Sequence, residues 1–263
     1  MQIGDSTRAL VTGASRGIGR ALAIELAGRG ATVGLLARDQ RALGALAEQL
    51  NGRAIVVPAD ITDRREVDRA VGAFVDEAGG LDLLVANAGI AHYGPFIEMD
   101  LDKIEEMVAV NVLGSLYVVR SALDRMLPAT APGQIVVVSS GAGLRAFPCA
   151  AVYGATKAAN RGFAEALRHE LADTPLSLTT VYPGEVETEL HSHQLERMPQ
   201  WRRGDEAIPA ATVATQIAEA VIADQRSLYT PRLVRLLGLA GVAPGLVDRL
   251  LRRIRGVTAA PRR

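Results

Sequence analysis

The chain has 263 residues, of which 49% are hydrophobic and 22% charged, and its 29 Lys and Arg balance its 29 Asp and Glu. This composition is typical of a globular protein and excludes an intrinsically disordered chain, while the zero net charge argues against a dedicated nucleic-acid-binding protein. The single cysteine, Cys149, excludes an intramolecular disulfide and is consistent with a cytoplasmic location.

No targeting segment and no membrane span are expected. Residues 1–8 lack the apolar stretch of a signal peptide. No run of 18 apolar residues occurs, and the longest candidate, 233–247, is interrupted by Arg235 and Pro244.

Short apolar runs alternate with longer stretches of helical period. Strands are predicted at Ala9–Thr12, Thr32–Ala37, Ala54–Pro58, Leu81–Ala86, Gln134–Ser139 and Leu176–Tyr182. Helices are predicted at Gly19–Arg29, Arg41–Asn51, Arg64–Ala78 and Leu101–Leu127. This alternation predicts an α/β fold, a doubly wound parallel sheet with helices on both faces, whose ligands bind at the carboxyl edge of the strands.

A glycine-rich turn follows the first predicted strand. Gly13, Gly17 and Gly19 have the spacing G-x-x-x-G-x-G and lead directly into a helix. Glycines let the backbone approach a pyrophosphate closely, and the free N–H groups of the helix face the anion. The turn therefore predicts a dinucleotide site.

The end of the second strand predicts which dinucleotide binds. An NAD site usually offers a carboxylate there to the ribose 2′-hydroxyl. Here the strand ends in Leu36-Ala37-Arg38, and the first acid is Asp39. Arg38, together with Arg16 in the glycine turn, suits a 2′-phosphate and predicts NADP(H) over NAD(H).

A second cluster of polar residues predicts acid–base chemistry. Tyr153 and Lys157 are four residues apart, on one face of a predicted helix. A neighbouring ammonium favours the tyrosinate and lowers the tyrosine pKa from about 10. Upstream, the fifth strand ends in Ser139-Ser140, at the sheet edge where chemistry is expected.

Taken together, these motifs resemble the short-chain dehydrogenase/reductase family over roughly residues 7–190. The matching positions, in the family's order and spacing, are Thr12-Gly13-x-x-x-Gly17-x-Gly19, Asp60-Ile61, Asn87-Ala88-Gly89, Asn111, Ser140, Tyr153-x-x-x-Lys157, and Pro183-Gly184 with Thr188. The resemblance implies one Rossmann-like domain over residues 1–230. An irregular, polar stretch within it predicts a substrate loop at about 185–209, and residues 231–263 are expected to form a basic amphipathic extension.

The resemblance also implies catalytic roles. Tyr153 resembles the general acid and base that exchanges a proton with the substrate oxygen, and Ser140 the serine that holds this oxygen. Lys157 resembles the residue that binds the nicotinamide ribose and lowers the tyrosine pKa. Asn111 resembles the asparagine that positions a water of the proton relay, whereas Ser139 is out of register and is expected to be structural.

A larger set is implied to contact the cofactor. Besides Tyr153 and Lys157 it comprises Gly13, Ser15, Arg16, Gly17, Ile18, Gly19, Arg38, Asp60, Ile61, Asn87, Ala88, Gly89, Pro183, Gly184, Val186 and Thr188. No metal site is expected, because His191 and His193 have no nearby cysteine.

The expected function is NADP(H)-dependent interconversion of a ketone or aldehyde and an alcohol, on an apolar small-molecule substrate. Reduction of a 3-oxoacyl carrier protein is one alternative, and a non-catalytic dinucleotide sensor or scaffold is another. The family resemblance implies a homo-oligomer, a dimer or a tetramer.

The C-terminal end of the chain combines apolar residues with many arginines. Leu246, Val247, Leu250, Leu251 and Ile254 recur at helical spacing between arginines, which predicts a basic amphipathic helix. Residues 226–263 carry a net charge of +8 and residues 1–225 one of −8. Three roles remain open for this helix: packing on its own domain or a partner subunit, covering an apolar substrate pocket, or contact with an anionic membrane surface.

Overall fold

The computed structural model describes residues 1–129, 131–190, 197 and 207–239. Most of the predicted substrate loop, with His191 and His193, lies outside the described residues. So does the predicted amphipathic helix of 246–255.

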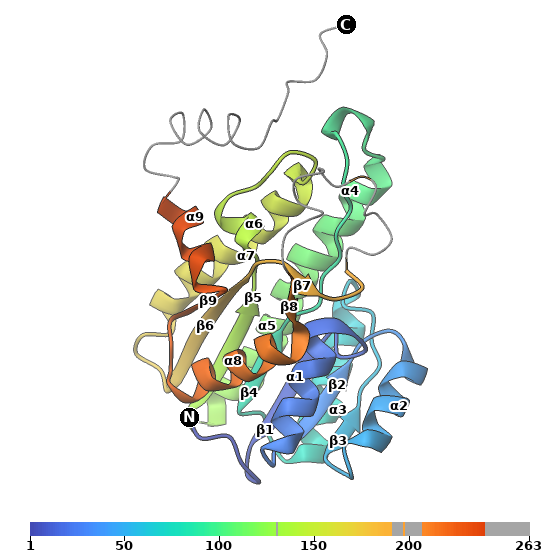
Figure 1. Cartoon of the computed structure of the whole chain (residues 1–263). Helices are drawn as coiled ribbons and strands as arrows, with labels where there is room; N and C mark the ends of the chain where they lie inside the picture. The colour runs from blue at the N-terminus through green and yellow to red at the C-terminus, as the bar shows by residue number, and fades with distance from the viewer. Residues whose placement is uncertain (130, 191–196, 198–206, 240–263) are drawn as a thin grey trace, which may run out of the picture.

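The centre of the molecule is a parallel sheet of seven strands in the order β3-β2-β1-β4-β5-β6-β9 (Figure 1). Every pairing in it is parallel. The strands are β1 (Arg8–Thr12), β2 (Thr32–Leu36), β3 (Ala54–Val56), β4 (Leu83–Ala86), β5 (Gly133–Val138), β6 (Leu176–Pro183) and β9 (Ser227–Thr230). A separate pair joins β7 (Val186–Glu187) to β8 (Ile208–Pro209).

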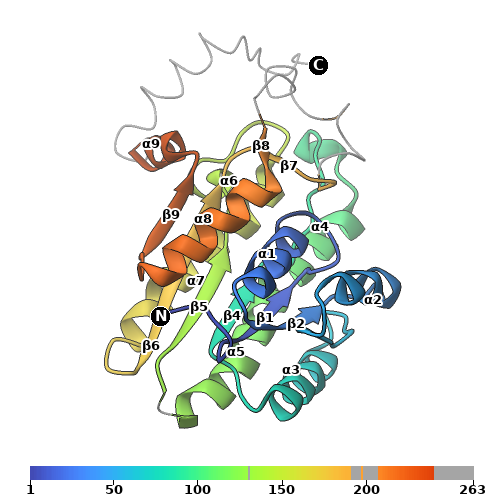
Figure 2. The same ribbon diagram turned by 60° about the horizontal axis from the view of Figure 1, so that its bottom comes forward.

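Helices cover both faces of the sheet, which confirms the predicted doubly wound α/β fold. The helices are α1 (Gly17–Gly28), α2 (Gln40–Gln49), α3 (Arg64–Ala78), α4 (Leu101–Val108), α5 (Ser115–Met126), α6 (Gly141–Leu144), α7 (Ala151–Glu170), α8 (Ala210–Ile222) and α9 (Arg235–Leu239). One core packs α1, α2 and α8 against the sheet, and the other packs α3, α5 and α7 (Figure 2).

Local chemistry sets several of the element ends. The carboxylate of Asp63 accepts hydrogen bonds from the backbone N–H groups of Arg65 and Glu66, at 2.7 and 3.2 Å, and so caps the first turn of α3. Gly79 ends this helix in the left-handed conformation, at φ 77°. These two signals are visible in the sequence, and the predicted bounds of α3 agree with the structure.

The helix predicted at Leu101–Leu127 is divided. A π-helical segment, Ala109–Gly114, separates α4 from α5 and contains Asn111. Taken as one continuous helical stretch, Leu101–Ala129 is the only part of the described chain that is long and apolar enough to cross a membrane. The mean hydropathy of its most apolar 18 residues is 1.3, but half of these residues are buried inside the fold. Its apolar side, which includes Val118, Val119 and Ala122, faces the core, as expected of a core helix.

The sequence prediction missed β9. This strand of four residues lies at the edge of the sheet, where Tyr229 stacks on Tyr182 of β6 with ring centroids 4.9 Å apart. The chain then makes a short 3-10 helix, Arg232–Val234, and α9. A strand this short has too few residues to establish a period, and only its pairing with β6 defines it.

Candidate active site

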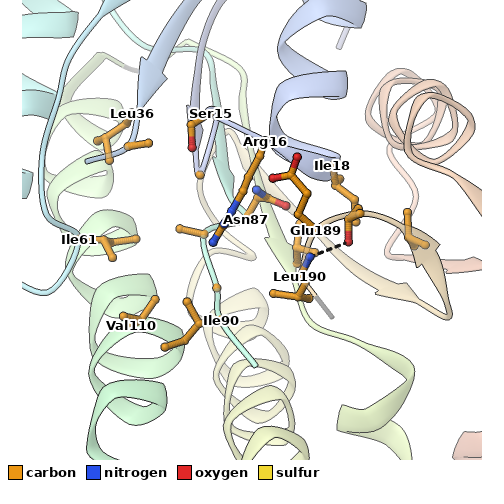
Figure 3. A pocket seen from close by; sticks show the side chains of 18 of the residues that line it. Ser15, Arg16, Ile18, Leu36, Ile61, Asn87, Ile90, Val110, Glu189 and Leu190 are labelled. Atoms are coloured by element: carbon orange, nitrogen blue, oxygen red, sulfur yellow. Dashed lines mark hydrogen bonds between the residues drawn. The ribbon is translucent and has the colours of Figure 1, made fainter. Parts of the chain in front are cut away.

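All strands of the main sheet end at one edge, and a cavity of about 480 Å³ opens there. Figure 3 shows side chains from both halves of the sheet pointing into it, among them Arg16, Ile61 and Leu190. The cavity runs from the end of β2, past the glycine turn, to the ends of β5 and β6. An elongated ligand therefore fits its shape.

The glycine turn is shaped for close approach by a ligand. Gly13 and Gly17 have φ of 66° and 54°, a region that side-chain-bearing residues rarely adopt. A Cβ at Gly19 would lie 2.3 Å from the carbonyl oxygen of Gly13. Arg16 precedes α1 without a side-chain cap, which leaves the first N–H groups of this helix for an anion.

The turn is tied to the segment after β4. The hydroxyl of Thr12 accepts hydrogen bonds from the backbone N–H groups of Asn87 and Ala88, at 2.9 and 3.0 Å. The amide of Asn87 donates in turn to the carbonyl oxygen of Thr12, at 2.9 Å. These bonds hold two walls of the cavity together without any ligand.

At the end of β2, Arg38 is exposed at the cavity, and the next residue, Asp39, caps a helix. The side chain of Arg38 is 64% exposed and lies 3.9 Å from the carboxylate of Asp60, a distant ion pair. Asp39 caps α2 by accepting a hydrogen bond from the N–H of Ala42, at 3.0 Å. Asp60 is itself held by the backbone N–H and hydroxyl of Thr62. The guanidinium of Arg38 thus has only a long ion pair and can meet an anion in the cavity, whereas one oxygen of Asp39 is engaged in capping α2.

Helix α7 places Tyr153 and Lys157 on its buried face, and both line the cavity. The ammonium of Lys157 donates to the carbonyl oxygen of Val138, at 3.0 Å. Burial lowers the pKa of Lys157 to about 8, because the charged form loses its hydration. The lysine is therefore held in the cavity wall by this hydrogen bond, and it gives up its proton more readily than an exposed lysine.

The two serines after β5 have different partners. Ser140 lines the cavity and caps α6 by accepting from the N–H of Ala142, at 3.1 Å. This bond uses an acceptor site and leaves its hydroxyl hydrogen available. Ser139 donates its own hydroxyl to the carbonyl oxygen of Lys157, at 2.7 Å, and so ties β5 to α7.

Asn111 lies behind the cavity wall. It is fully buried. Its side-chain oxygen accepts a hydrogen bond from the N–H of Ile90, at 2.8 Å, and its amide nitrogen donates one to the carbonyl oxygen of Ile90, at 2.9 Å. Its amide also donates to the hydroxyl of Thr156 on α7, at 3.0 Å. A Cβ at Gly89 would lie 3.2 Å from both the Asn111 oxygen and the Lys157 nitrogen, so glycine keeps this approach open.

An aromatic group lies beside Tyr153. Tyr93 is buried and meets Tyr153 edge to face, with ring centroids 5.9 Å apart, and it stacks on Phe147 at 6.1 Å. The loops that carry them are joined by a hydrogen bond from the N–H of Gly94 to the carbonyl of Cys149, a residue with φ of 67°. Aromatic side chains close after the Asn87-Ala88-Gly89 segment are the sequence signal for this wall.

Most predicted site residues therefore meet in one cavity. Gly19 and Asn111 are the predicted residues that do not line it, and both support residues that do. The lining residues that were not predicted are Leu36, Ala37, Asp39, Ala42, Ala59, Ile90, Val110, Val138, Ser139, Glu189 and Leu190. Most are apolar and carry no chemical motif. In the described residues there is no group of three His, Cys, Asp or Glu that could hold a metal ion.

Comparison with known proteins agrees with this geometry. Residues 7–199 match the family model of short chain dehydrogenases. An uncharacterised oxidoreductase of Staphylococcus epidermidis is 37% identical over 180 residues, covering 68% of this chain and 78% of that protein. Glycine betaine reductase of Emericella nidulans is 40% identical over 185 residues, covering 69% of this chain but 14% of that protein.

Solved structures agree as well. A short-chain dehydrogenase/reductase from Burkholderia phymatum in complex with NAD has a TM-score of 0.85 at 25% identity, with 94% of this chain and 96% of that chain covered. A 3-ketoacyl-(acyl-carrier-protein) reductase from Brucella melitensis, complexed with NADH, has a TM-score of 0.77 at 28% identity, with 85% and 96% covered. A serine dehydrogenase complexed with NADP+ has a TM-score of 0.78 at 26% identity, with 85% and 94% covered. The chain thus belongs to the short-chain dehydrogenase family and is an oxidoreductase of that family.

Proposed function

We propose that the protein is an NADP(H)-dependent oxidoreductase that interconverts a ketone or aldehyde and an alcohol. The observation that carries the cofactor preference is the chemistry at the end of β2. Arg38 lines the cavity with only a long ion pair to Asp60, and Asp39, the first acid after the strand in sequence, caps α2. A phosphate on the 2′-oxygen gains a cation here, whereas a free 2′-hydroxyl lacks its usual acceptor.

The remainder of the cavity suits a dinucleotide. The glycine turn and the uncapped start of α1 receive the pyrophosphate, with Ser15, Gly17 and Ile18 along it. Asp60 and Ile61 lie toward the adenine end, and Asn87, Ala88 and Gly89 form the wall between. Pro183, Gly184, Val186 and Thr188 border the end nearest Tyr153, where the nicotinamide would lie. When bound, the dinucleotide supplies or accepts the hydride.

The protein's own contribution is the handling of the substrate oxygen. In reduction, the hydroxyls of Ser140 and Tyr153 donate hydrogen bonds to the carbonyl oxygen as negative charge builds on it. Tyr153 then gives up its proton, and in oxidation it takes one back. The ammonium of Lys157 stabilises the resulting tyrosinate, and Asn111 holds the backbone of Ile90 beside this pair. A positioned proton donor of this kind contributes on the order of 10²–10⁴ to the rate.

The walls around the substrate position favour an apolar substrate. Ile90 and Leu190 line the cavity, and the rings of Tyr93 and Phe147 form a contiguous aromatic group beside Tyr153. Ile90 and Leu190 bind apolar groups by burial and leave the polar contacts to Ser140 and Tyr153, while the aromatic group packs outside the cavity lining and supports Tyr153. We further propose a cytoplasmic homo-oligomer with a single catalytic domain over residues 1–230.

The test is NADPH and NADH oxidation by the full chain with a panel of ketones and aldehydes of increasing chain length. We expect turnover with NADPH that exceeds turnover with NADH at equal concentration. The Tyr153→Phe variant should still bind NADPH, measured by fluorescence titration, but lose nearly all turnover. Tyr117→Phe, on α5 away from the cavity, is the control and should keep its activity. Retained turnover in Tyr153→Phe would refute the role of this residue.

Two other functions are distinguished by the same assay. A 3-oxoacyl-carrier-protein reductase, supported by the likeness to the Brucella melitensis enzyme, would reduce a 3-oxoacyl thioester far better on a carrier protein than as a free small thioester. A dinucleotide sensor would bind NADPH but turn over no substrate. The presence of Ser140, Tyr153 and Lys157 in one cavity weighs against the sensor.

A further inference from the structure

The segment that follows β9 packs on the loops of the active site. Val234 is buried and would lie 3.3 Å from a Cβ added at either Gly141 or Gly184. Leu237 of α9 would approach the same position at Gly141 to 3.4 Å. Gly141 follows the predicted catalytic Ser140, and Gly184 lies at the nicotinamide end of the cavity. The inner face of this segment is therefore fixed to the active-site edge of the molecule.

The outer face of the same segment has no cover in the described structure. Leu233 is 69% exposed and Leu236 is 54% exposed, although both are large apolar side chains. Arg232 and Arg235 are exposed beside them and form no ion pair with any acid in the part of the chain that the structure describes. We call these four residues the α9 face. Two leucines between two unpaired arginines make a surface that is both apolar and cationic.

The sequence around the α9 face extends this character. Residues 226–263 contain nine arginines and one acid, Asp248. Beyond the described residues, the spacing of Leu246, Leu250 and Ile254 between arginines predicts a further amphipathic stretch. The cationic character thus belongs to the end of the chain as a whole.

A second exposed apolar surface at the same edge has the opposite charge. Phe96 and Ile97, which precede α4, and Leu101, its first residue, are 63%, 91% and 71% exposed. Their exposed neighbours are the acids Glu98, Asp100 and Asp102. We call this surface the acidic lobe. An anionic partner would be attracted to the α9 face and repelled from the acidic lobe.

We propose that the α9 face binds the surface of an anionic lipid bilayer. Leucine side chains enter the headgroup region, and the arginines pair with lipid phosphates, the pattern of an interfacial helix. Each basic residue near an anionic membrane contributes separately to binding. A stable protein interface takes about 20–30 residues a side, far more than the eight described residues from Arg232 to Leu239. Charge and size together favour a lipid surface over a second protein.

The proposal also gives an orientation. Because the segment from Arg232 to Leu239 packs on Gly141 and Gly184, its binding to a bilayer brings the edge of the sheet that carries the cavity close to the lipid. Repulsion between the acidic lobe and the anionic headgroups would keep α4 farther from the bilayer than α9. An apolar substrate dissolved in the bilayer would then have a short path to the cavity.

The experiment is co-sedimentation of the full chain with vesicles of phosphatidylcholine alone or with 30% phosphatidylglycerol. We expect binding to the anionic vesicles, at least tenfold weaker binding to the neutral ones, and loss of binding when NaCl is raised from 50 to 500 mM. The variants are Leu233→Ser with Leu236→Ser, and Arg232→Gln with Arg235→Gln. Each pair should lower the vesicle partition coefficient at least tenfold, because these side chains make the contact.

The matched control is Phe96→Ser with Ile97→Ser on the acidic lobe, which removes as much exposed apolar surface but should leave vesicle binding unchanged. Thermal unfolding checks that all variants fold. Equal binding to neutral and anionic vesicles, or equal loss in the control, would overturn the proposal. A change in molecular mass by light scattering in the Leu233 and Leu236 variant, without a change in vesicle binding, would assign the face to a second copy instead. None of these readouts depends on catalysis, so they are independent of the proposed function.

Discussion

At the scale of single residues, the site depends on which polar atoms are already engaged. Asp39 and Arg38 are adjacent in sequence, yet one caps a helix and the other is exposed to the cavity. Ser139 and Ser140 are likewise adjacent, and one bonds the backbone of Lys157 while the other caps α6 from the cavity wall. The chemistry available to a ligand follows from these hydrogen bonds more than from residue type.

The first prediction concerns Arg38. Its replacement in Arg38→Ala should weaken NADPH binding about 10- to 100-fold, because a charge-assisted contact to the 2′-phosphate is worth about 1.5–3 kcal/mol. NADH binding should change little. Fluorescence titration with both dinucleotides measures the ratio. Arg41→Ala is the control, since Arg41 is an exposed arginine in the first turn of α2, three residues further along the chain, and does not line the cavity. Equal weakening of NADPH and NADH would contradict the assignment.

At the scale of elements, strand ends and helix starts bring the site together. The π-helical segment Ala109–Gly114 is an example, because it interrupts a helix at the position of Asn111. π-helical turns are rare and often occur at functional sites. The fully buried Asn111 then bonds the backbone of Ile90 and the hydroxyl of Thr156, linking the end of β4 to α7. The periodicity of the sequence continues through this segment and does not reveal it.

Two glycines in helices lead to opposite predictions. Gly162 of α7 is exposed, and a Cβ added there would meet nothing within 4 Å. Gly162→Ala should therefore raise the free energy of unfolding by about 0.5–1 kcal/mol, because alanine loses less conformational entropy than glycine in a helix. Gly19→Ala in α1 should lower stability and abolish dinucleotide binding, since its Cβ would lie 2.3 Å from a backbone oxygen of the glycine turn.

Urea unfolding and NADPH titration of the two glycine variants test this pair. A gain in stability for Gly162→Ala with unchanged binding is the expected result. Normal NADPH binding by Gly19→Ala would mean that the turn can shift without losing its ligand, contrary to the proposed anion site.

At the scale of the whole molecule, burial of Lys157 couples stability to pH. Burial lowers the pKa of Lys157 to about 8, whereas an unfolded lysine titrates near 10.4. Between these values the unfolded lysine holds more protons than the folded one, so the contribution of Lys157 to the free energy of unfolding rises as pH is raised from 8 to 10. Burial also raises the pKa of Tyr182 to about 12, and stability then falls above pH 10 because the unfolded tyrosine ionises first.

This rise can be isolated with the chain's two lysines. Lys157→Met should remove the increase between pH 8 and 10 that Lys157 contributes, while Lys103→Met, at an exposed lysine of α4, should keep it. Urea unfolding at three pH values in this range gives the difference between each variant and the parent. The thiol of Cys149, whose pKa burial raises, is common to all three proteins and cancels in the comparison. The same slope in Lys157→Met and the parent would show that the lysine is not the source.

The sequence by itself determined the fold class, six of the seven strands of the main sheet and the location of the dinucleotide turn. It could do so because apolar periodicity, glycine spacing and helix caps act over a few neighbouring residues. Asp63 and Gly79 are examples, since they bound α3 through contacts within a single turn. The spacing of Tyr153 and Lys157 was likewise readable, because it depends only on the pitch of one helix.

Only the tertiary structure decided which of these residues meet and what else surrounds them. Strand β9 is defined by its pairing with β6, and the aromatic wall of Tyr93 and Phe147 by two loops that are distant in sequence. The lowered pKa of Lys157 arises from burial, and the exposure of Leu233 and Leu236 from packing of the opposite side of their segment on Gly141. Burial, desolvation and long-range contacts depend on every element at once, and so no local pattern of residues encodes them.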